Sequence, residues 1–402
     1  MPILTTVVLA AGLSAAPYTH DPKLAEECRP RDGLPNTFAR IQAGGPVRIA
    51  YLGGSITAAK GWRVKTMAWF RKQFPDASFE EINASISGTG SDFSACRLGT
   101  DVLNRSPDLI FLECRVNGHG GFPLQSVEGI VRQVWRSHPN TDICFVYTIG
   151  TWMVKELQAG KTPGFGVVME TVANRYGIPT IDMGIEIAKQ EAAGTMVHKA
   201  PGPVEGKTVF SRDGVHPGDA GHGIYRDVVA RSILAMKGAA GRRPHALGEK
   251  MHEHCWEEAS LLPIEKAQLS SGWSPVDVAT DPVYRDSFGR TKAMLRDTVK
   301  CSEVGESITV RWNGTTVGFS DIPHVGPMVI EARIDETTTK LFKRTQREMH
   351  RKYSRFFYLP ELPHGEHTVT FTIKELPEGA SLYAGQFLIV GTPRHPNTPA
   401  PK

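Results

Sequence analysis

Short apolar runs alternate with amphipathic segments in the first 240 residues. Three of these runs are of a length typical of strands covered on both faces, at 47–52 (VRIAYL), 109–112 (LIFL) and 143–148 (ICFVYT). Residues 127–135 carry apolar side chains at spacings of three and four, as an amphipathic helix does. Similar patterns predict helices at 62–74, 166–176 and 217–236. This alternation predicts a three-layer α/β/α sandwich with a parallel sheet.

The pattern changes after residue 237. Residues 238–248 are rich in Gly, Arg and Pro and indicate a linker. From Ile308 onward apolar residues occur at every second position, and Asn313-Gly314 predicts a hairpin turn. Further alternating segments lie at 328–334 and, after a predicted turn at 365–367, at 369–373. Short alternating strands of this kind favour a smaller all-β sandwich domain.

Length and composition agree with two domains in a chain of 402 residues. We expect an α/β domain at 21–237, a linker at 238–262, a β-sandwich at 263–392 and a loose tail at 393–402. A net charge of +4 with scattered Lys and Arg gives no reason to expect a nucleic-acid partner. No apolar stretch is long enough to span a membrane. The six cysteines show no CxxC spacing, and Cys114 and Cys144 lie inside apolar runs, which favours buried thiols.

The N-terminus resembles a signal peptide within residues 1–20. Residues 2–16 are apolar and end in small side chains, although no Lys or Arg precedes them and Pro17 is poorly placed for cleavage after Ala16. This pattern favours export to the periplasm or medium. A misassigned start or a buried N-terminal segment is the alternative.

Four stretches carry candidate chemistry, and each ends or follows a predicted strand. They are 51–57 (YLGGSIT), 83–91 (NASISGTGS), 113–118 (ECRVNG) and 213–217 (DGVHP). Open α/β sheets bind ligands beyond the carboxyl ends of their strands, so these stretches are expected at one edge. Together they supply a serine, candidate oxyanion donors, and a histidine with an acidic residue three positions before it. This is a complete set for acyl transfer.

Ser55, Asp213 and His216 are the candidate catalytic residues. Two glycines precede Ser55 and allow a sharp turn, whereas a phosphate-binding loop would need a further glycine and a lysine at fixed spacing. In DGVHP, Asp213 can hold one ring nitrogen of His216 while the other faces the serine. The alternative is a surface loop with an aspartate that caps the next helix.

Gly88 and Asn117 are the candidate oxyanion donors, Gly88 through its backbone N–H and Asn117 through its side-chain amide. Each could instead form an ordinary turn. Arg115 is expected on the same side of its strand as Glu113 and Asn117. It could form an internal salt bridge with Glu113 or another carboxylate, or it could face the cleft and bind an anionic sugar.

These motifs resemble the SGNH (GDSL-type) hydrolase superfamily over about residues 45–235. NASISG and DGVHP match its second and fifth blocks, and GGSIT is a variant of its first. The resemblance implies Ser55 as nucleophile, His216 as base and Asp213 as its orienting group. It implies an oxyanion hole made by the N–H groups of Ser55 and Gly88 and the amide of Asn117.

The chain departs from the SGNH pattern at three positions. Gly54 replaces a common aspartate, Gly118 also replaces a common aspartate, and Arg115 replaces a small apolar residue. None of these changes removes a catalytic group. The two-domain plan, with GGSIT and a following β-domain, is similar to bacterial SGNH proteins thought to act on carbohydrate esters.

We therefore expect a serine esterase that removes acyl groups from carbohydrate, and acetyl is the acyl group that we favour. The expected partner is a small or oligosaccharide ester, and the chemistry needs no metal or organic cofactor. The alternatives are a lipid esterase or thioesterase with the same chemistry, or a carbohydrate-binding module whose hydrolase site is unused. The adjacent residues 252–255 (HEHC) have no second pair at metal-ligand spacing, so a solvated segment is expected there.

Overall fold

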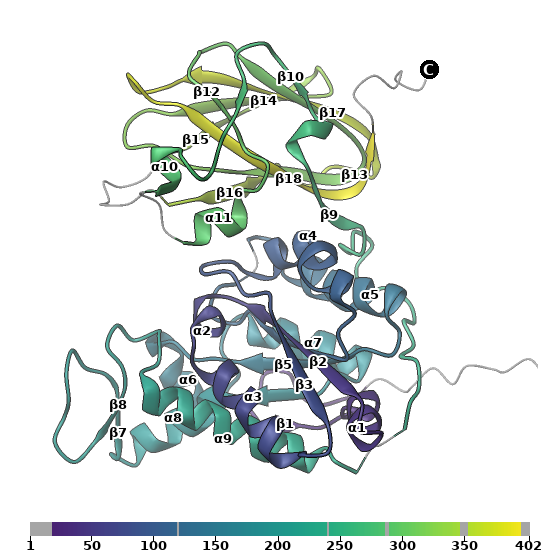
Figure 1. The fold of residues 1–402 in the computed structure, drawn as a ribbon, viewed down its shortest axis with the longest axis vertical. Coiled ribbons are helices and arrows are strands. Elements are labelled where there is room, and N and C mark those ends of the chain that lie inside the picture. Colours follow the sequence, from purple (N-terminus) through teal and green to yellow (C-terminus); the bar gives the residue numbers. More distant parts are fainter. Residues whose placement is uncertain (1–17, 119, 239–240, 286–288, 346–352, 395–402) are drawn as a thin grey trace, which may run out of the picture.

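The computed structural model describes residues 18–118, 120–238, 241–285, 289–345 and 353–394. Two domains lie one above the other, as Figure 1 shows. The elements of the first domain are β1 (Cys28–Arg29), α1 (Pro35–Gln42), β2 (Pro46–Gly53), α2 (Ser55–Ala58), α3 (Trp62–Gln73), β3 (Ser78–Asn83), α4 (Ser91–Asp101), η1 (Leu103–Arg105), β4 (Leu109–Glu113), α5 (Pro123–Ser137), β5 (Asp142–Tyr147), η2 (Thr151–Met153), α6 (Val154–Gln158), α7 (Gly166–Tyr176), β6 (Thr180–Asp182), α8 (Met183–Ala192), β7 (Met196–Lys199), β8 (Thr208–Ser211) and α9 (Asp219–Ala235).

The sheet of the first domain has the order β1-β6-β5-β4-β2-β3. All of its pairs are parallel except β1 with β6, which is antiparallel. The three strands predicted from apolar runs are confirmed as β2, β4 and β5. Helix α9 begins two residues later than predicted, because the backbone of residues 217–218 bonds to β8, including an N–H of Gly218 that donates to Phe210.

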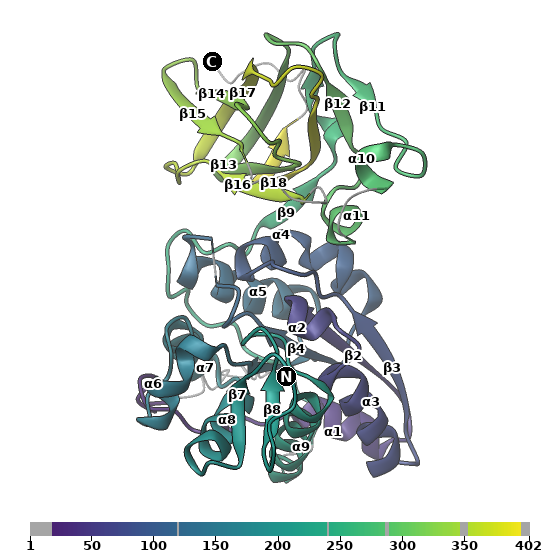
Figure 2. The ribbon, with the colours of Figure 1, turned by 90° about the vertical axis from the view of Figure 1, so that its left-hand side faces the viewer.

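Both faces of this sheet are covered, which explains why the central strands β4 and β5 are buried at every position. On one face, residues of α1, α3, α8 and α9 share a core with Val47, Ile49 and Tyr51 of β2. On the other face, residues of α4, α5 and α7 share a core with Ala50 and Leu52. The first domain is therefore the predicted three-layer α/β/α sandwich, and Figure 2 shows its helices on either side of the sheet.

The second domain is all-β apart from short helical turns. Its described elements are β9 (Ala259–Leu262), η3 (Ile264–Lys266), β10 (Gln268–Leu269), β11 (Ser274–Pro275), α10 (Pro282–Arg285), α11 (Arg290–Met294), β12 (Val299–Cys301), β13 (Ser307–Asp321), β14 (Val329–Ile334), β15 (Thr338–Lys343), β16 (Arg355–Tyr358), β17 (Gly365–Glu375) and β18 (Leu382–Arg394). These described strands form one antiparallel hydrogen-bonded set, in which β13 pairs with β10, β16, β17 and β18. These strands enclose a hydrophobic core of their own, which confirms a separate all-β domain.

Two turns predicted in this domain are wrong. Asn313-Gly314 lies in the middle of β13, where Gly314 pairs with Gly365 on one side and Gly391 on the other. A Cβ at Gly314 would collide with the backbone of β18, so glycine serves a close approach of strands rather than a hairpin. The predicted turn at 365–367 is the start of β17.

The two domains share apolar packing through the α4–α5 layer. The ring centroids of Phe93, on α4, and Phe356 are 4.8 Å apart, and those of Phe122 and Trp256 are 4.6 Å apart. Trp256 and strand β9 lie in the range 238–262 that was expected to be a linker. Trp256 is nevertheless fully buried, and β9 pairs with β18. Figure 1 shows α4 and α5 between the first sheet and the second domain.

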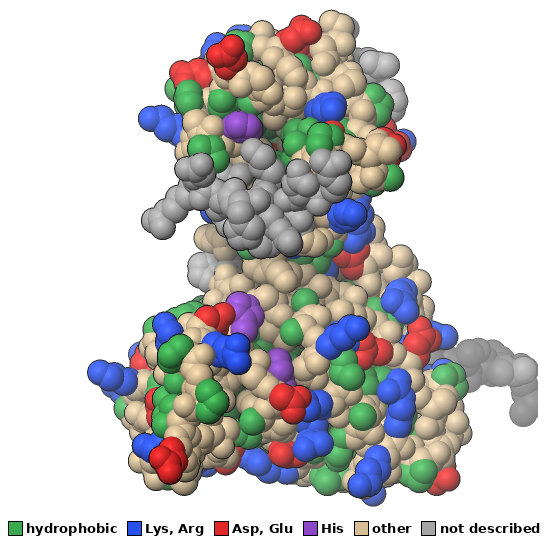
Figure 3. All heavy atoms as spheres, turned by 60° about the vertical axis from the view of Figure 1, so that its left-hand side comes forward, with side chains coloured by type: hydrophobic (Ala, Val, Ile, Leu, Met, Phe, Trp, Pro, Cys, Tyr) green, Lys and Arg blue, Asp and Glu red, His purple; other side chains and the backbone are tan. Residues whose placement is uncertain are grey.

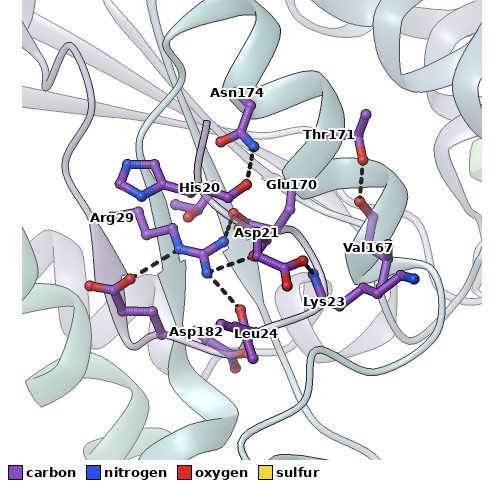
Figure 4. Close-up of polar contacts among 12 residues, drawn as sticks. His20, Asp21, Lys23, Leu24, Arg29, Val167, Glu170, Thr171, Asn174 and Asp182 are labelled. Atoms are coloured by element: carbon purple, nitrogen blue, oxygen red, sulfur yellow. Dashed lines mark hydrogen bonds and ion pairs between the residues drawn. The ribbon is translucent and has the colours of Figure 1, made fainter. Parts of the chain in front are cut away.

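The described N-terminal segment is anchored by a buried ionic network, shown in Figure 4. Arg29 donates to Glu170 at 2.6 Å and to the carbonyl oxygens of Asp21 and Leu24. Arg31 also donates to Glu170 at 2.6 Å. Although burial opposes its charge, the two arginines hold the pKa of Glu170 below its usual range.

The expected signal peptide falls almost entirely on residues 1–17, outside the described part of the chain. Among described helices, none is long and apolar enough to cross a membrane.

Candidate active site

Ser55 is the first residue of helix α2 and directly follows β2 through Gly53 and Gly54. The two glycines are required by close packing. A Cβ at Gly53 would meet the backbone oxygen of Glu113 at 2.7 Å, and a Cβ at Gly54 would collide with the side-chain oxygen of Asn117. An aspartate, which many SGNH sequences carry at the position of Gly54, would require the Asn117 side chain to move.

His216 lies between Ser55 and Asp213. Its Nε2 is 2.8 Å from Oγ of Ser55, and its Nδ1 is 2.7 Å from Oδ2 of Asp213. An ionised aspartate can only accept hydrogen bonds, so Nδ1 carries the proton and Nε2 is left to accept from the serine hydroxyl. About half of each of the His216 and Asp213 side chains is exposed, so the arrangement opens to solvent.

Asp213 is held in its ionised form by the loop that contains it. Its Oδ1 accepts the N–H groups of Val215 and His216, both at 2.8 Å, and the hydroxyl of Ser211 at 2.9 Å. Burial opposes the charge, but these hydrogen bonds and the one from the His216 ring keep the pKa of Asp213 well below its usual range. Helix α9 is capped by Gly218, so Asp213 is not a helix cap.

Gly214 fixes this loop to the rest of the domain. Its carbonyl oxygen accepts the N–H and the hydroxyl of Thr151, both at 2.9 Å, and lies 3.2 Å from Nε2 of the buried His198. Gly214 has φ +89°, and a Cβ there would collide with the Thr151 hydroxyl. The sequence analysis did not identify Thr151 or His198, since neither lies in a recognisable motif.

Gly88 and Asn117 lie on either side of the Ser55 strand. The loop that holds Gly88 is bonded to the end of β2, with the N–H of Ile86 donating to the carbonyl of Gly53 at 3.0 Å. Asn117 follows the neighbouring strand β4, and its amide packs on Gly54 as described above. Gly118 has φ +82°, a conformation that favours glycine over the aspartate common in SGNH sequences.

Glu113 is a buried carboxylate directly behind the serine. Its two oxygens accept hydroxyl hydrogen bonds from Thr148 at 2.7 Å and Thr57 at 2.9 Å, and Oε2 lies 3.4 Å from the N–H of Gly54. Burial raises its pKa. The sequence analysis considered Glu113 only as a partner for Arg115; here it links β4 and β5 to the start of α2.

Arg115 is buried and points away from solvent. Its guanidinium binds both oxygens of Asp182, at 2.5 and 2.8 Å, and the carbonyl oxygen of Thr148. The guanidinium also lies 5.0 Å from the ring of Tyr147. Of the two roles considered for Arg115, these contacts are those of an internal salt bridge, and its partner is Asp182 rather than Glu113. They leave the Arg115 side chain no exposed surface that could bind a sugar.

The second domain reaches the Gly88 side of the site. A Cβ at Gly88 would collide with Nη1 of Arg290, which begins α11. The guanidinium of Arg290 lies 4.1 Å from the ring of Tyr353 and donates to its hydroxyl. Burial lowers the pKa of Arg290. A separate cleft of about 340 Å³ lies between the domains and is lined by Gly120, Phe122 and residues of β15 and β16.

No group of three or more His, Cys, Asp or Glu side chains in the described residues could hold a metal ion. The segment 252–255, expected to be solvated, is partly packed: Cys255 is buried, and His254 lies 3.3 Å from Glu361 in the second domain. Among the described residues, the six thiols are all free, and Cys114 and Cys144 are buried.

These features define a two-domain protein with an α/β/α domain, a β-domain, and a Ser-His-Asp arrangement at the carboxyl edge of its sheet. Two solved structures share this architecture across both domains. One is a two-domain esterase active on acetylated mannans, with a TM-score of 0.73 and 21% identity over 92% of this chain and 98% of that chain. The other is such an esterase co-crystallised with mannopentaose, with a TM-score of 0.71 and 21% identity over 89% and 94%. At this identity the likeness establishes the fold. No family model and no curated protein sequence matches the chain.

Proposed function

We propose that this protein is a serine esterase of the SGNH type. The observation that carries the proposal is the continuous chain of hydrogen bonds from Ser55 through His216 to Asp213, at 2.8 and 2.7 Å. In the first step His216 takes the proton of Ser55 as Oγ attacks the ester carbonyl. The carbonyl oxygen becomes negative and is stabilised by the N–H groups of Ser55 and Gly88 and the amide of Asn117.

His216 then gives its proton to the leaving alcohol, and the acyl group stays on Ser55. Water attacks this acyl-enzyme in a second step, with His216 again as the base. Asp213 stays ionised throughout, because its low pKa keeps the charge that stabilises the protonated imidazole. Arg115 has a structural role in this scheme, since Asp182 and Thr148 satisfy its guanidinium.

The substrate we propose is an acylated, first of all acetylated, carbohydrate. Support comes from the resemblance of both domains to an esterase active on acetylated mannans. The half-exposed His216 agrees with a leaving group that extends out of the protein. Arg290 places a positive charge from the second domain beside Gly88, on the side where the oxyanion forms.

Two measurements test this proposal. A fluorophosphonate probe should label the wild type and fail to label Ser55→Ala; a wild type that resists labelling would favour a binding module with an unused site. Rates on acetylated manno- and xylo-oligosaccharides should then exceed rates on octanoate esters and acyl thioesters. The reverse order would favour a lipid esterase or thioesterase.

A further inference from the structure

Trp152 is an exposed tryptophan next to the proposed active site. All seven tryptophans lie in the described residues, and Trp152 is the most exposed of them, at 58%. Single exposed apolar side chains are common on proteins and carry no argument alone. Hydrophobic side chains are scattered in this way over the face drawn in Figure 3. The location and orientation of the Trp152 ring are what distinguish it.

The six-membered ring of Trp152 lies flat over Gly150. Three adjacent ring carbons, Cζ2, Cη2 and Cζ3, are 2.6–2.7 Å from the position a Cβ would take at Gly150. Three adjacent atoms can be nearly equidistant from one point only if the point lies over the ring face, because a point beyond the edge is much closer to one of them. One face of the ring therefore covers Gly150, and a ring so exposed has its other face open.

Trp152 is tied to the loop that carries the histidine. The preceding residue, Thr151, donates its N–H and hydroxyl to the carbonyl of Gly214, which lies between Asp213 and His216. In the sheet order β5-β4-β2-β3, Trp152 follows β5, Ser55 follows β2, and Gly88 follows β3. Trp152 and Gly88 are thus on opposite sides of Ser55. Two strand spacings separate β5 from β2, about 10 Å.

The chemistry of ester cleavage decides where the leaving alcohol lies. The carbonyl oxygen must face the oxyanion donors, whereas the alcohol oxygen must lie next to Nε2 of His216, which protonates it. The leaving alcohol therefore extends past His216, beside the loop to which Thr151 ties Trp152. A pyranose ring has an apolar face of C–H groups, and the electron-rich face of an indole attracts such groups.

We propose that the open face of Trp152 is a stacking platform for a sugar ring of the leaving alcohol. The platform is a binding subsite one or two sugars from the scissile ester, and it selects oligosaccharide esters over small esters. Gly150 is part of it, because any side chain there would push the indole out of position. This inference rests on the proposed function.

The test compares an acetylated oligosaccharide with ethyl acetate, whose leaving alcohol has no ring. Trp152→Ala should raise KM for acetylated manno- or xylo-oligosaccharide by about 10-fold with kcat little changed, and should leave ethyl acetate hydrolysis unaffected. Trp152→Phe should recover part of the affinity. Leu234→Ala, which also removes an exposed apolar side chain, is the control and should change neither substrate.

Equal losses on both substrates would overturn the proposal, since they would show that Trp152 only supports the Gly214 loop. An unchanged KM for the oligosaccharide would overturn it as well. If the wild type hydrolyses neither substrate, the proposed function fails instead. Calorimetry of oligosaccharide binding to the wild type and to Trp152→Ala then tests the stacking platform separately. The proposal requires the variant to bind the oligosaccharide about 10-fold more weakly.

Discussion

The side-chain amide of Asn117 packs against Gly54 so closely that a Cβ at residue 54 would collide with its Oδ1. Oδ1 faces Gly54 and the amide nitrogen lies farther away, at 3.4 Å from the same Cβ position; this nitrogen is the proposed oxyanion donor. Asn117→Ala should lower kcat by roughly 10²- to 10³-fold with KM nearly unchanged, the usual result of removing one oxyanion donor. Steady-state kinetics on an acetyl ester check this. An effect confined to KM would show that Asn117 binds the ground state.

Gly54→Asp introduces the residue that many SGNH sequences have, yet here it should lower kcat roughly 10²- to 10³-fold, as Asn117→Ala does. The new side chain would displace Asn117 from its place beside Ser55. The matched control is Gly99→Ala in helix α4, where nothing lies within 4 Å of the added Cβ. The control should keep full activity and gain up to about 1 kcal/mol of stability. A Gly54→Asp variant with wild-type kcat would show that the packing does not position Asn117.

Removing Arg115 should destabilise the fold without discriminating between substrates. Arg115→Ala leaves Asp182 charged and buried, which costs about 3–5 kcal/mol in the free energy of unfolding. Arg231→Ala is the control, because its ion pair with Glu27 is partly exposed and should contribute less than about 1 kcal/mol. Urea unfolding gives both values. A raised KM for uronic-acid esters alone, with unchanged stability, would contradict the structural role.

Asp92 should make stability depend on pH. It lies on helix α4, its buried Oδ2 has no hydrogen-bond partner among the residues that the structure describes, and burial raises its pKa to about 6 from 3.8. The folded state thus binds the proton more tightly than the unfolded state. The free energy of unfolding should therefore fall as pH rises from about 4 to 6, by about 3 kcal/mol. The stability of Asp92→Asn relative to the wild type should rise by that amount over this range; a difference that is constant with pH would contradict the account.

The sequence predicted those parts of the fold that depend on local patterns. Strands β2, β4 and β5 are apolar on both faces because helices cover both faces of the sheet. Their apolar runs could therefore be recognised in the sequence. The prediction of a turn at Asn313-Gly314 was wrong because a glycine also suits a close approach of two strands. That approach depends on the partner strand β18, which is distant in the sequence.

The same limit applies to the candidate site. Residues that contribute through a motif, such as Ser55 and His216, could be proposed from sequence. Thr151, His198 and Arg290 could not, because their relevance comes from contacts with Gly214 and Gly88 that are distant in the chain. Arg115 was left open between two roles, and only the position of Asp182 distinguishes them.

The most direct test of the account is a double-mutant cycle on Ser55 and His216, whose reacting atoms are 2.8 Å apart although 161 positions separate the residues. The measurement is kcat for an acetylated oligosaccharide in Ser55→Ala, His216→Ala and the double variant. Residues that act as one unit are strongly non-additive, so each single change should cost several orders of magnitude and the double variant should be little worse than either. If Ser55→Ala keeps more than about a tenth of the activity, or if the two losses multiply, the proposed nucleophile and base are wrong.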